Sequence, residues 1–150
     1  MSATDRVYIG LDPGAKGAIA CIDCAGDYVA HVDLGIATLA EAAEFLREFG
    51  PRALAALESV SPGPAMGRGS AMKLGRAEGE LRGLLVALQI RHQCVAPSAW
   101  QGALGCRTRG DKRVTLRQAQ ARWPHVPMTV SGKSQPADAL LIAEWCRRMA

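Results

Sequence analysis

This 150-residue chain has three acidic residues that are candidates for a catalytic or metal-binding role: Asp12, Glu58 and Asp138. Asp12 ends an apolar run and precedes a Pro-Gly turn, and Glu58 likewise ends an apolar run before a turn rich in proline and glycine. A buried carboxylate loses its hydration, so it needs a metal, another cation or strong hydrogen bonds nearby. Three such groups together are enough to hold two Mg²⁺ or Mn²⁺ ions for phosphodiester hydrolysis.

Two of these acids also have a simpler structural interpretation. Asp12 could cap its own Pro-Gly turn, a common role for aspartate. Asp138 follows Pro136, which suits the first position of a helix, and an acid in the first turn favours the helix dipole. Taken one at a time, the residues leave both alternatives open.

The first half of the chain contains the elements that must position Asp12 and Glu58. Residues 7–12, 17–23 and 28–34 read as three strands with short turns, which predicts an antiparallel meander. Thr38 and Glu41 have the spacing of a capping box, which predicts a helix that ends at Gly50. A strand over 53–60 follows this helix and is expected to lie parallel to the first, with both acids at one sheet edge.

The second half predicts helices over 71–88, 111–123 and 136–145, a strand over 90–96 and a short helix capped by Ser98. The expected fold class is therefore α/β, with helices around a mixed sheet. A chain of this length fits one domain spanning residues 1–150.

Gly75, Gly79 and Gly83 recur every four residues in the helix predicted over 71–88. Each glycine costs helix stability by about 1 kcal/mol relative to alanine. Close approach of another backbone would explain this cost, so we expect tight packing on this face. The packing could be across a dimer interface or within one chain.

Basic residues are concentrated in the later part of the chain. Residues 1–58 hold four Lys or Arg against nine Asp or Glu, whereas residues 59–150 hold fourteen against five. A polyanion such as nucleic acid fits this asymmetry, although a solvated basic helix face is an equally simple explanation. The densest run and the residues after it supply the candidate phosphate contacts Arg107, Arg109, Lys112, Arg113 and Arg117.

The remaining composition excludes some classes of protein. Cys21 and Cys24 have no second close cysteine pair to complete a zinc site, so we expect them to be strand and turn residues. The sequence shows neither a twenty-residue apolar run nor a signal-peptide pattern. We therefore expect a cytoplasmic protein without a membrane partner.

An ordered series of short motifs resembles the RuvC-like Holliday junction resolvases, and most closely their phage-associated branch. The motifs extend over nearly the whole chain, and their number and order carry the resemblance. They are Gly10-Leu11-Asp12-Pro13-Gly14, Leu57-Glu58, Leu74-Gly75-x-Ala77-x-Gly79, Pro97-x-x-Trp100, Lys112, Arg122-Trp123-Pro124 and Ala137-Asp138-Ala139-Leu140.

The resemblance implies an RNase H-like fold and a homodimer that uses Mg²⁺ or Mn²⁺, two ions per site, to nick two strands of a four-way DNA junction. It implies that Asp12, Glu58 and Asp138 bind metal and that Lys112 acts at the scissile phosphate. The loop 62–69 would enter the junction, with Arg68 and then Lys73 near the DNA. The resemblance implies a bacterial cell as the host, and leaves open whether the gene belongs to the bacterium or to a phage or prophage.

One departure from the family pattern keeps other functions open. The family often has Asp or His three residues before the last acid, where this chain has Gln135, which cannot act as a base. A junction-binding protein with weakened or no nuclease activity is therefore the alternative, and a flap or RNA substrate is a further one. Actin-like ATPases and sugar kinases share an Asp-x-Gly turn but need a second domain, for which 150 residues leave no room.

Overall fold

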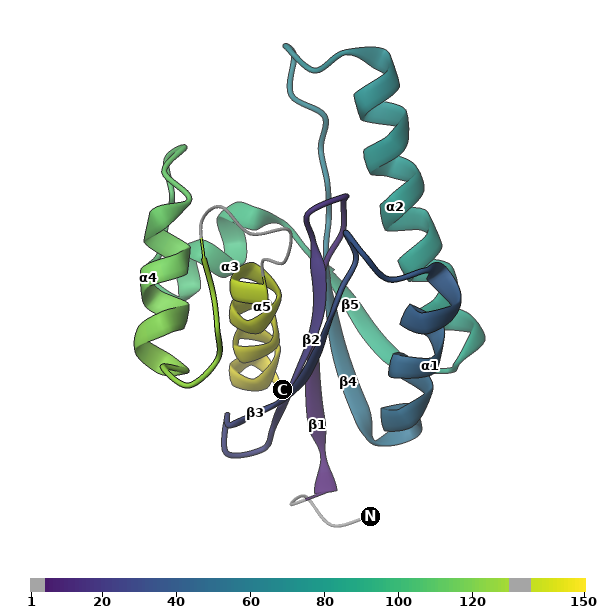
Figure 1. The fold of residues 1–150 in the computed structure, drawn as a ribbon, viewed down its shortest axis with the longest axis vertical. Helices are drawn as coiled ribbons and strands as arrows, with labels where there is room; N and C mark the ends of the chain where they lie inside the picture. Colours follow the sequence, from purple (N-terminus) through teal and green to yellow (C-terminus); the bar gives the residue numbers. More distant parts are fainter. Residues whose placement is uncertain (1–4, 130–135) are drawn as a thin grey trace.

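Five strands form one mixed sheet in the order β3-β2-β1-β4-β5 in the computed structural model, which describes residues 5–129 and 136–150 (Figure 1). The strands β1 (Val7–Asp12), β2 (Ala18–Asp23) and β3 (Tyr28–Asp33) form an antiparallel meander. The strands β4 (Ala53–Glu58) and β5 (Arg91–Val95) extend the sheet in parallel from β1. The predicted mixed sheet, with a three-strand meander and parallel strands, is confirmed.

Helices cover both faces of this sheet (Figure 1). One face carries α1 and α2, and the other carries α3, α4 and α5. Their bounds are α1 (Leu39–Phe49), α2 (Arg68–Ala87), α3 (Pro97–Ala103), α4 (Arg113–Arg122) and α5 (Pro136–Met149), and a 3-10 turn, η2 (Gly50–Arg52), leads into β4. None of the helices in the described part of the chain is long and apolar enough to cross a membrane.

Each face of the sheet has its own apolar core. On the α1 and α2 side, Leu46, Leu81 and Leu85 pack against the strands, and on the other side Trp100 and Leu140 do so. The strand β1 supplies residues to both cores because its side chains alternate between the two faces. This double burial explains why its sequence is almost continuously apolar.

The helix α1 begins as its capping box predicts. The Thr38 hydroxyl accepts a hydrogen bond from the Glu41 backbone N–H at 3.2 Å, and the Glu41 carboxylate accepts one from the Thr38 N–H at 2.7 Å. The helix ends at Gly50, whose φ of 47° is one that glycine adopts readily. Local sequence therefore sets both ends of α1.

The helix α3 corrects one sequence prediction. It begins at Pro97, after Ala96, and Ser98 lies inside the first turn rather than capping it. Proline suits this first position because its φ is already helical and its missing N–H would have no partner there. The prediction that Ser98 caps this helix is wrong because the proline determines where the helix starts.

A close contact between β1 and α5 brings the two ends of the sequence together. A side chain on Gly10 would place its Cβ 1.9 Å from the Ala139 carbonyl oxygen and 2.4 Å from the Ala143 nitrogen. No residue but glycine fits such a gap without displacing the helix backbone. Because Gly10 lies two residues before Asp12 and Ala139 follows Asp138, this contact brings the two acids to the same region.

The glycine face of α2 is open. No described atom outside the local helix backbone lies within 4 Å of the Cβ that Gly75, Gly79 or Gly83 would carry. The prediction of tight packing within one chain is therefore wrong at these positions. Gly75, Gly79 and Gly83 are exposed, whereas Leu81 and Leu85 are the buried residues of this helix, and its N-terminal half also extends beyond the edge of the sheet (Figure 1). Packing across a dimer interface stays a prediction.

Candidate active site

The strands β1 and β4 bring Asp12 and Glu58 side by side at one edge of the sheet. Leu11 pairs with Leu57 in the parallel register, and the next residue on each strand is the acid. The turn after Asp12 folds back tightly, since a Cβ on Gly17 would lie 1.9 Å from the Asp12 carbonyl oxygen. The predicted meeting of these two carboxylates is confirmed.

Asp138 approaches the same edge from the first turn of α5. Its Oδ1 atom is buried and has no hydrogen-bond partner among the residues that the structure describes. Buried carboxylate oxygens are normally satisfied, so an orphan such as this one needs an explanation. A bound cation is one group that would satisfy it.

The three acids perturb one another. Burial, followed by the negative charges of Asp138 and Glu58, raises the pKa of Asp12 well above its ordinary value. Burial also raises the pKa of Glu58 and that of Asp138. The Asp12 and Glu58 carboxyl groups lie close enough for each to affect the pKa of the other. The fold thus holds three acids in a place that disfavours their charges.

Lys112 is the positive charge beside this cluster. It lies directly before α4, and its charge lowers the pKa of Asp12, of Glu58 and of Asp138 in opposition to burial. The Lys112 side chain is exposed, so it can reach a ligand that enters from solvent. The structure therefore brings together all four residues that the sequence assigned to catalysis.

Two neutral side chains that the sequence reasoning left without a role also hold these acids. The Trp100 indole N–H donates to the Glu58 Oε1 atom at 2.8 Å. The Thr115 hydroxyl donates to the Lys112 carbonyl oxygen at 3.1 Å, and its polar group beside Asp138 lowers the pKa of that acid. Trp100 is fully buried and Thr115 is 2% exposed. The Pro-x-x-Trp motif drew attention to Trp100, but nothing in the sequence marked Thr115.

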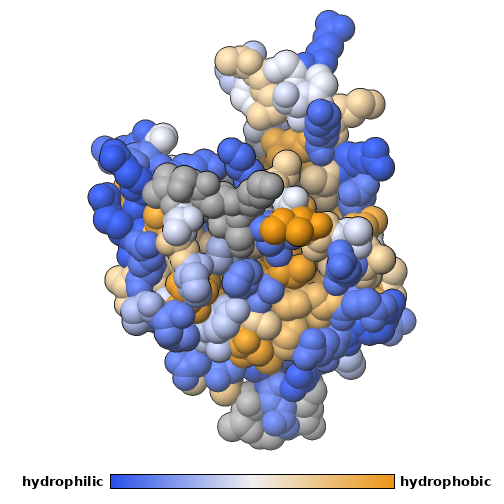
Figure 2. All heavy atoms as spheres, viewed as in Figure 1, coloured by the Kyte–Doolittle hydropathy of each residue, from blue (hydrophilic) through white to orange (hydrophobic). Residues whose placement is uncertain are grey.

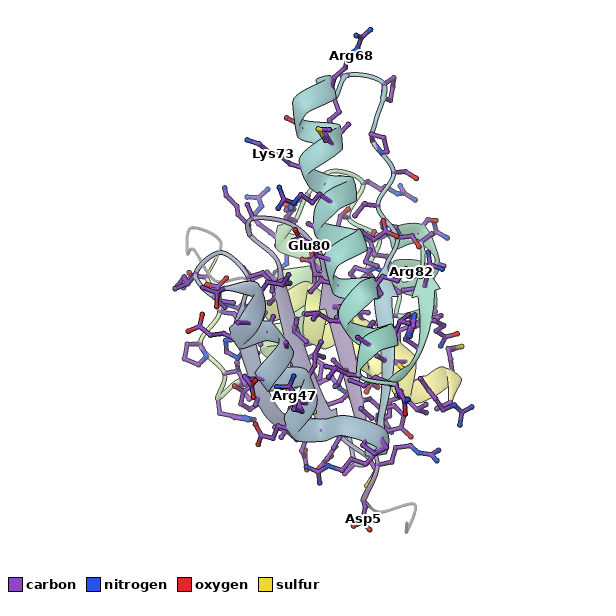
Figure 3. The ribbon with its side chains drawn as sticks, turned by 90° about the vertical axis from the view of Figure 1, so that its right-hand side faces the viewer. Asp5, Arg47, Arg68, Lys73, Glu80 and Arg82 are labelled. Atoms are coloured by element: carbon purple, nitrogen blue, oxygen red, sulfur yellow. The ribbon has the colours of Figure 1, made fainter. Side chains whose placement is uncertain are left out.

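The basic candidates lie on both sides of the acid cluster. Arg107, Arg109, Lys112, Arg113 and Arg117 are exposed on α4 and on the segment before it. Figure 2 shows this left-hand flank as strongly hydrophilic. On the other flank, Figure 3 shows Arg68 at the tip of α2 and Lys73 pointing away from that helix. Of these residues, Arg113 is already paired, with its Nε atom 2.9 Å from the Asp111 Oδ1 atom.

The donor set fits a hard divalent cation, because all three acids offer oxygen. Within the described residues, however, no three His, Cys, Asp or Glu side chains converge on one metal position. Mg²⁺ does not need such convergence, because it keeps several waters and takes only one or two carboxylates along with substrate phosphate. The orphaned Asp138 oxygen and the raised pKa of Asp12 are features that a cation would resolve. The residues therefore fit Mg²⁺ or Mn²⁺ bound by pairs of acids.

Two sequence predictions concern neighbouring segments. Gln135 lies outside the described residues, so its relation to Asp138 stays a prediction. The segment 62–69 is exposed throughout, but only residues 62–67 form a loop, because α2 already begins at Arg68.

Comparison with solved structures identifies the fold. The chain superimposes on Thermus thermophilus RuvC in complex with a Holliday junction substrate with a TM-score of 0.67, at 19% sequence identity and over 96% of each chain. It has the fold of RuvC. A second Thermus thermophilus RuvC structure matches with the same TM-score and identity, over 95% of this chain and 96% of that one. No family model matches the sequence, and no curated protein matches it.

The match to RuvC confirms the RNase H-like fold class that the motifs implied. At 19% identity the match rests on the arrangement of the elements and not on overall sequence. Both RuvC chains are covered almost completely, so the described elements correspond to nearly the whole of each neighbour. The match shows the fold alone, and the residues at the sheet edge are what indicate a function.

Proposed function

We propose that this protein is a metal-dependent endodeoxyribonuclease that resolves four-way DNA junctions. The observation that carries the proposal is the cluster of Asp12, Glu58 and Asp138, which are crowded and partly buried at one sheet edge beside Lys112. Stability alone does not account for three mutually repelling acids, because their charged forms are disfavoured there. Perturbed titratable groups of this kind cluster at functional sites. The RuvC fold supports the same activity, since one matching structure contains a Holliday junction substrate.

The mechanism follows from the position of each group. Asp12 would be the central ligand, because the negative charges of both Asp138 and Glu58 act on it. Two Mg²⁺ or Mn²⁺ ions held by these acids would supply an activated water and neutralise charge on the phosphate. Lys112 would stabilise the negative charge that develops on the phosphate oxygens. The arginines on and before α4 would hold the DNA backbone through contacts that do not read sequence.

A homodimer would present two such sites to two symmetry-related strands. The open glycine face of α2 supports an interface there, because a second backbone can approach glycine closely and no described part of this chain occupies that face. The prediction is a solution mass twice that of the 15.9 kDa chain. Replacing Gly79 with Leu should lower this mass toward that of a monomer, and an unchanged dimer would exclude this face.

A gel assay tests the proposal. Labelled four-way junction, linear duplex, flap DNA and RNA are each incubated with the protein in Mg²⁺, in Mn²⁺ and in EDTA. We expect paired nicks in the four-way junction only, and only with a divalent cation. Binding to the junction without nicking in either metal would favour the alternative, a junction-binding protein with weakened activity. Equal cleavage of linear duplex would contradict selectivity for the junction.

A further inference from the structure

The contact between Trp100 and Glu58 joins two distant parts of the chain. Trp100 lies in α3 with 0% exposure, and its indole N–H donates to the Glu58 Oε1 atom at 2.8 Å across 42 residues of sequence. A buried indole N–H needs a partner, and this one uses a carboxylate at the candidate metal site. A backbone carbonyl, the more usual partner, would have satisfied the indole equally well.

An indole is an unusual choice of donor for such a carboxylate. It donates one hydrogen bond, accepts none, carries no charge and cannot bind a metal. It therefore orients Glu58 without neutralising it and without competing for the cation. Because the Trp100 ring is packed within the apolar core on this side of the sheet, the direction of its N–H is fixed. The Glu58 Oε2 atom is left for other partners.

We propose that Trp100 is a positioning residue whose indole N–H holds the Glu58 carboxylate in the orientation that binds a divalent cation. This inference rests on the proposed function, because it takes the cation site as given. Outer partners of metal ligands commonly fix the ligand geometry, and their removal typically costs 10- to 100-fold in metal affinity, by order of magnitude. Trp100 itself would touch neither the cation nor the DNA.

The variant Trp100→Phe removes the N–H and keeps an aromatic ring in the core. We expect its dissociation constant for Mn²⁺ to rise about tenfold, measured by electron paramagnetic resonance on the protein without DNA. The Mn²⁺ concentration for half-maximal cleavage should rise in parallel. The cleavage rate at saturating Mn²⁺ should stay close to that of the unmodified protein, because the same ligands are then occupied.

Trp123→Phe is the matched control. Trp123 is also buried, at 2% exposure, and its indole N–H donates to the Gly26 carbonyl oxygen at 3.0 Å, far from the acids. This variant loses an equivalent buried hydrogen bond, so it should lose comparable stability and bind Mn²⁺ normally. Equal weakening of Mn²⁺ binding in both variants would show a general loosening of the fold and overturn the proposal. Unchanged binding in Trp100→Phe would overturn it as well.

A second substitution guards against misfolding of Trp100→Phe. Benzothienylalanine at position 100 has the shape of tryptophan with sulfur in place of the N–H group, so it should fold normally and still weaken Mn²⁺ binding. Normal Mn²⁺ affinity with this analogue contradicts the role of Trp100. Absence of Mn²⁺ binding by the unmodified protein would instead overturn the cation site, and this inference with it.

Discussion

The two ends of α5 each carry an acid with buried oxygen, and the two acids have opposite surroundings. Glu144, near the C-terminal end, is 1% exposed and is bound by three arginines, with N–O distances of 3.0 Å to Arg122, 2.8 Å to Arg147 and 2.7 Å to Arg148. Asp138, in the first turn, keeps a buried oxygen with no partner in the described chain. Both acids lie against the same side of the sheet.

The pKa values of these two acids are shifted in opposite directions. Burial raises the pKa of Glu144, but hydrogen bonds from Arg147 and Arg148 and the charge of Arg122 bring it below its ordinary value. Burial raises the pKa of Asp138, and Thr115 and Lys112 offset this only in part. An acid that serves the fold is neutralised by its own chain. Under the proposed function, Asp138 keeps its oxygen for a partner from outside the chain, at a cost in stability.

The largest expected difference between the two ends is in catalysis. Asp138→Asn should lower junction cleavage on the order of a thousandfold, because metal-held charge stabilisation is worth several kcal/mol. Glu144→Gln should cleave nearly as well as the unmodified protein at a temperature where it is folded. Single-turnover nicking of a four-way junction in Mn²⁺ measures both, with Asp12→Asn as an inactive reference that should still bind the junction. Full cleavage by Asp138→Asn would show that Asp138 is not needed for catalysis.

The same two substitutions should have opposite effects on the free energy of unfolding. Glu144→Gln leaves three arginines close together without their carboxylate, so it should lower the free energy of unfolding by about 3 kcal/mol. Asp138→Asn removes a buried charge without a partner and should raise the free energy of unfolding by about 1 kcal/mol. Urea denaturation in EDTA at neutral pH measures both changes. The comparison fails if both substitutions destabilise to the same extent.

The acids at the two ends of α5 should also affect the pH dependence of stability with opposite signs. The raised pKa values of Asp12, Glu58 and Asp138 mean that the folded protein holds protons that the unfolded chain releases, so they lower stability as pH rises above the ordinary carboxyl range. Glu144, with its lowered pKa, stabilises the fold above its ordinary pKa and loses this effect as pH falls through the lowered one.

Thermal unfolding from pH 3 to 8 in EDTA tests these opposite signs. The decline with rising pH should be smaller in Asp138→Asn than in the unmodified protein. Glu144→Gln should lose the acid-side dependence and keep the decline. Mg²⁺ or Mn²⁺ should abolish the decline, because a cation favours the ionised acids. A decline of the same size with and without metal would mean that no cation binds the acids.

The sheet edge is the part of the site that the sequence predicts well. Asp12 and Glu58 each end an apolar strand, and parallel neighbours must place their carboxyl ends together, so their meeting follows from local patterns. The start of α1 is equally local, because Thr38 and Glu41 satisfy each other within one turn. Such features depend on residues that are close in the sequence or on one strand pairing.

The contacts that the sequence does not predict depend on how helices pack. Glu144 has Arg147 and Arg148 at helical spacing, which suggests an ordinary surface ion pair; its burial depends on α4 packing against α5, where Arg122 joins. The bond from Trp100 to Glu58 likewise depends on the path of α3. The glycines of α2 led to a wrong prediction of packing within the chain, because they lie on the exposed face of a helix that packs through Leu81 and Leu85.

Gly10 fixes how closely α5 approaches β1, and this approach also affects the spacing of the acids. Adding a single methyl group there would force α5 away from β1 by about an ångström, given the 1.9 Å approach to the Ala139 carbonyl oxygen. A shift of that size at reacting groups costs about a hundredfold in rate. The distance between Asp12 and Asp138 therefore depends on the absence of a Cβ atom at position 10. For protein engineering, this makes Gly10 a position where any side chain should change the spacing of the two acids.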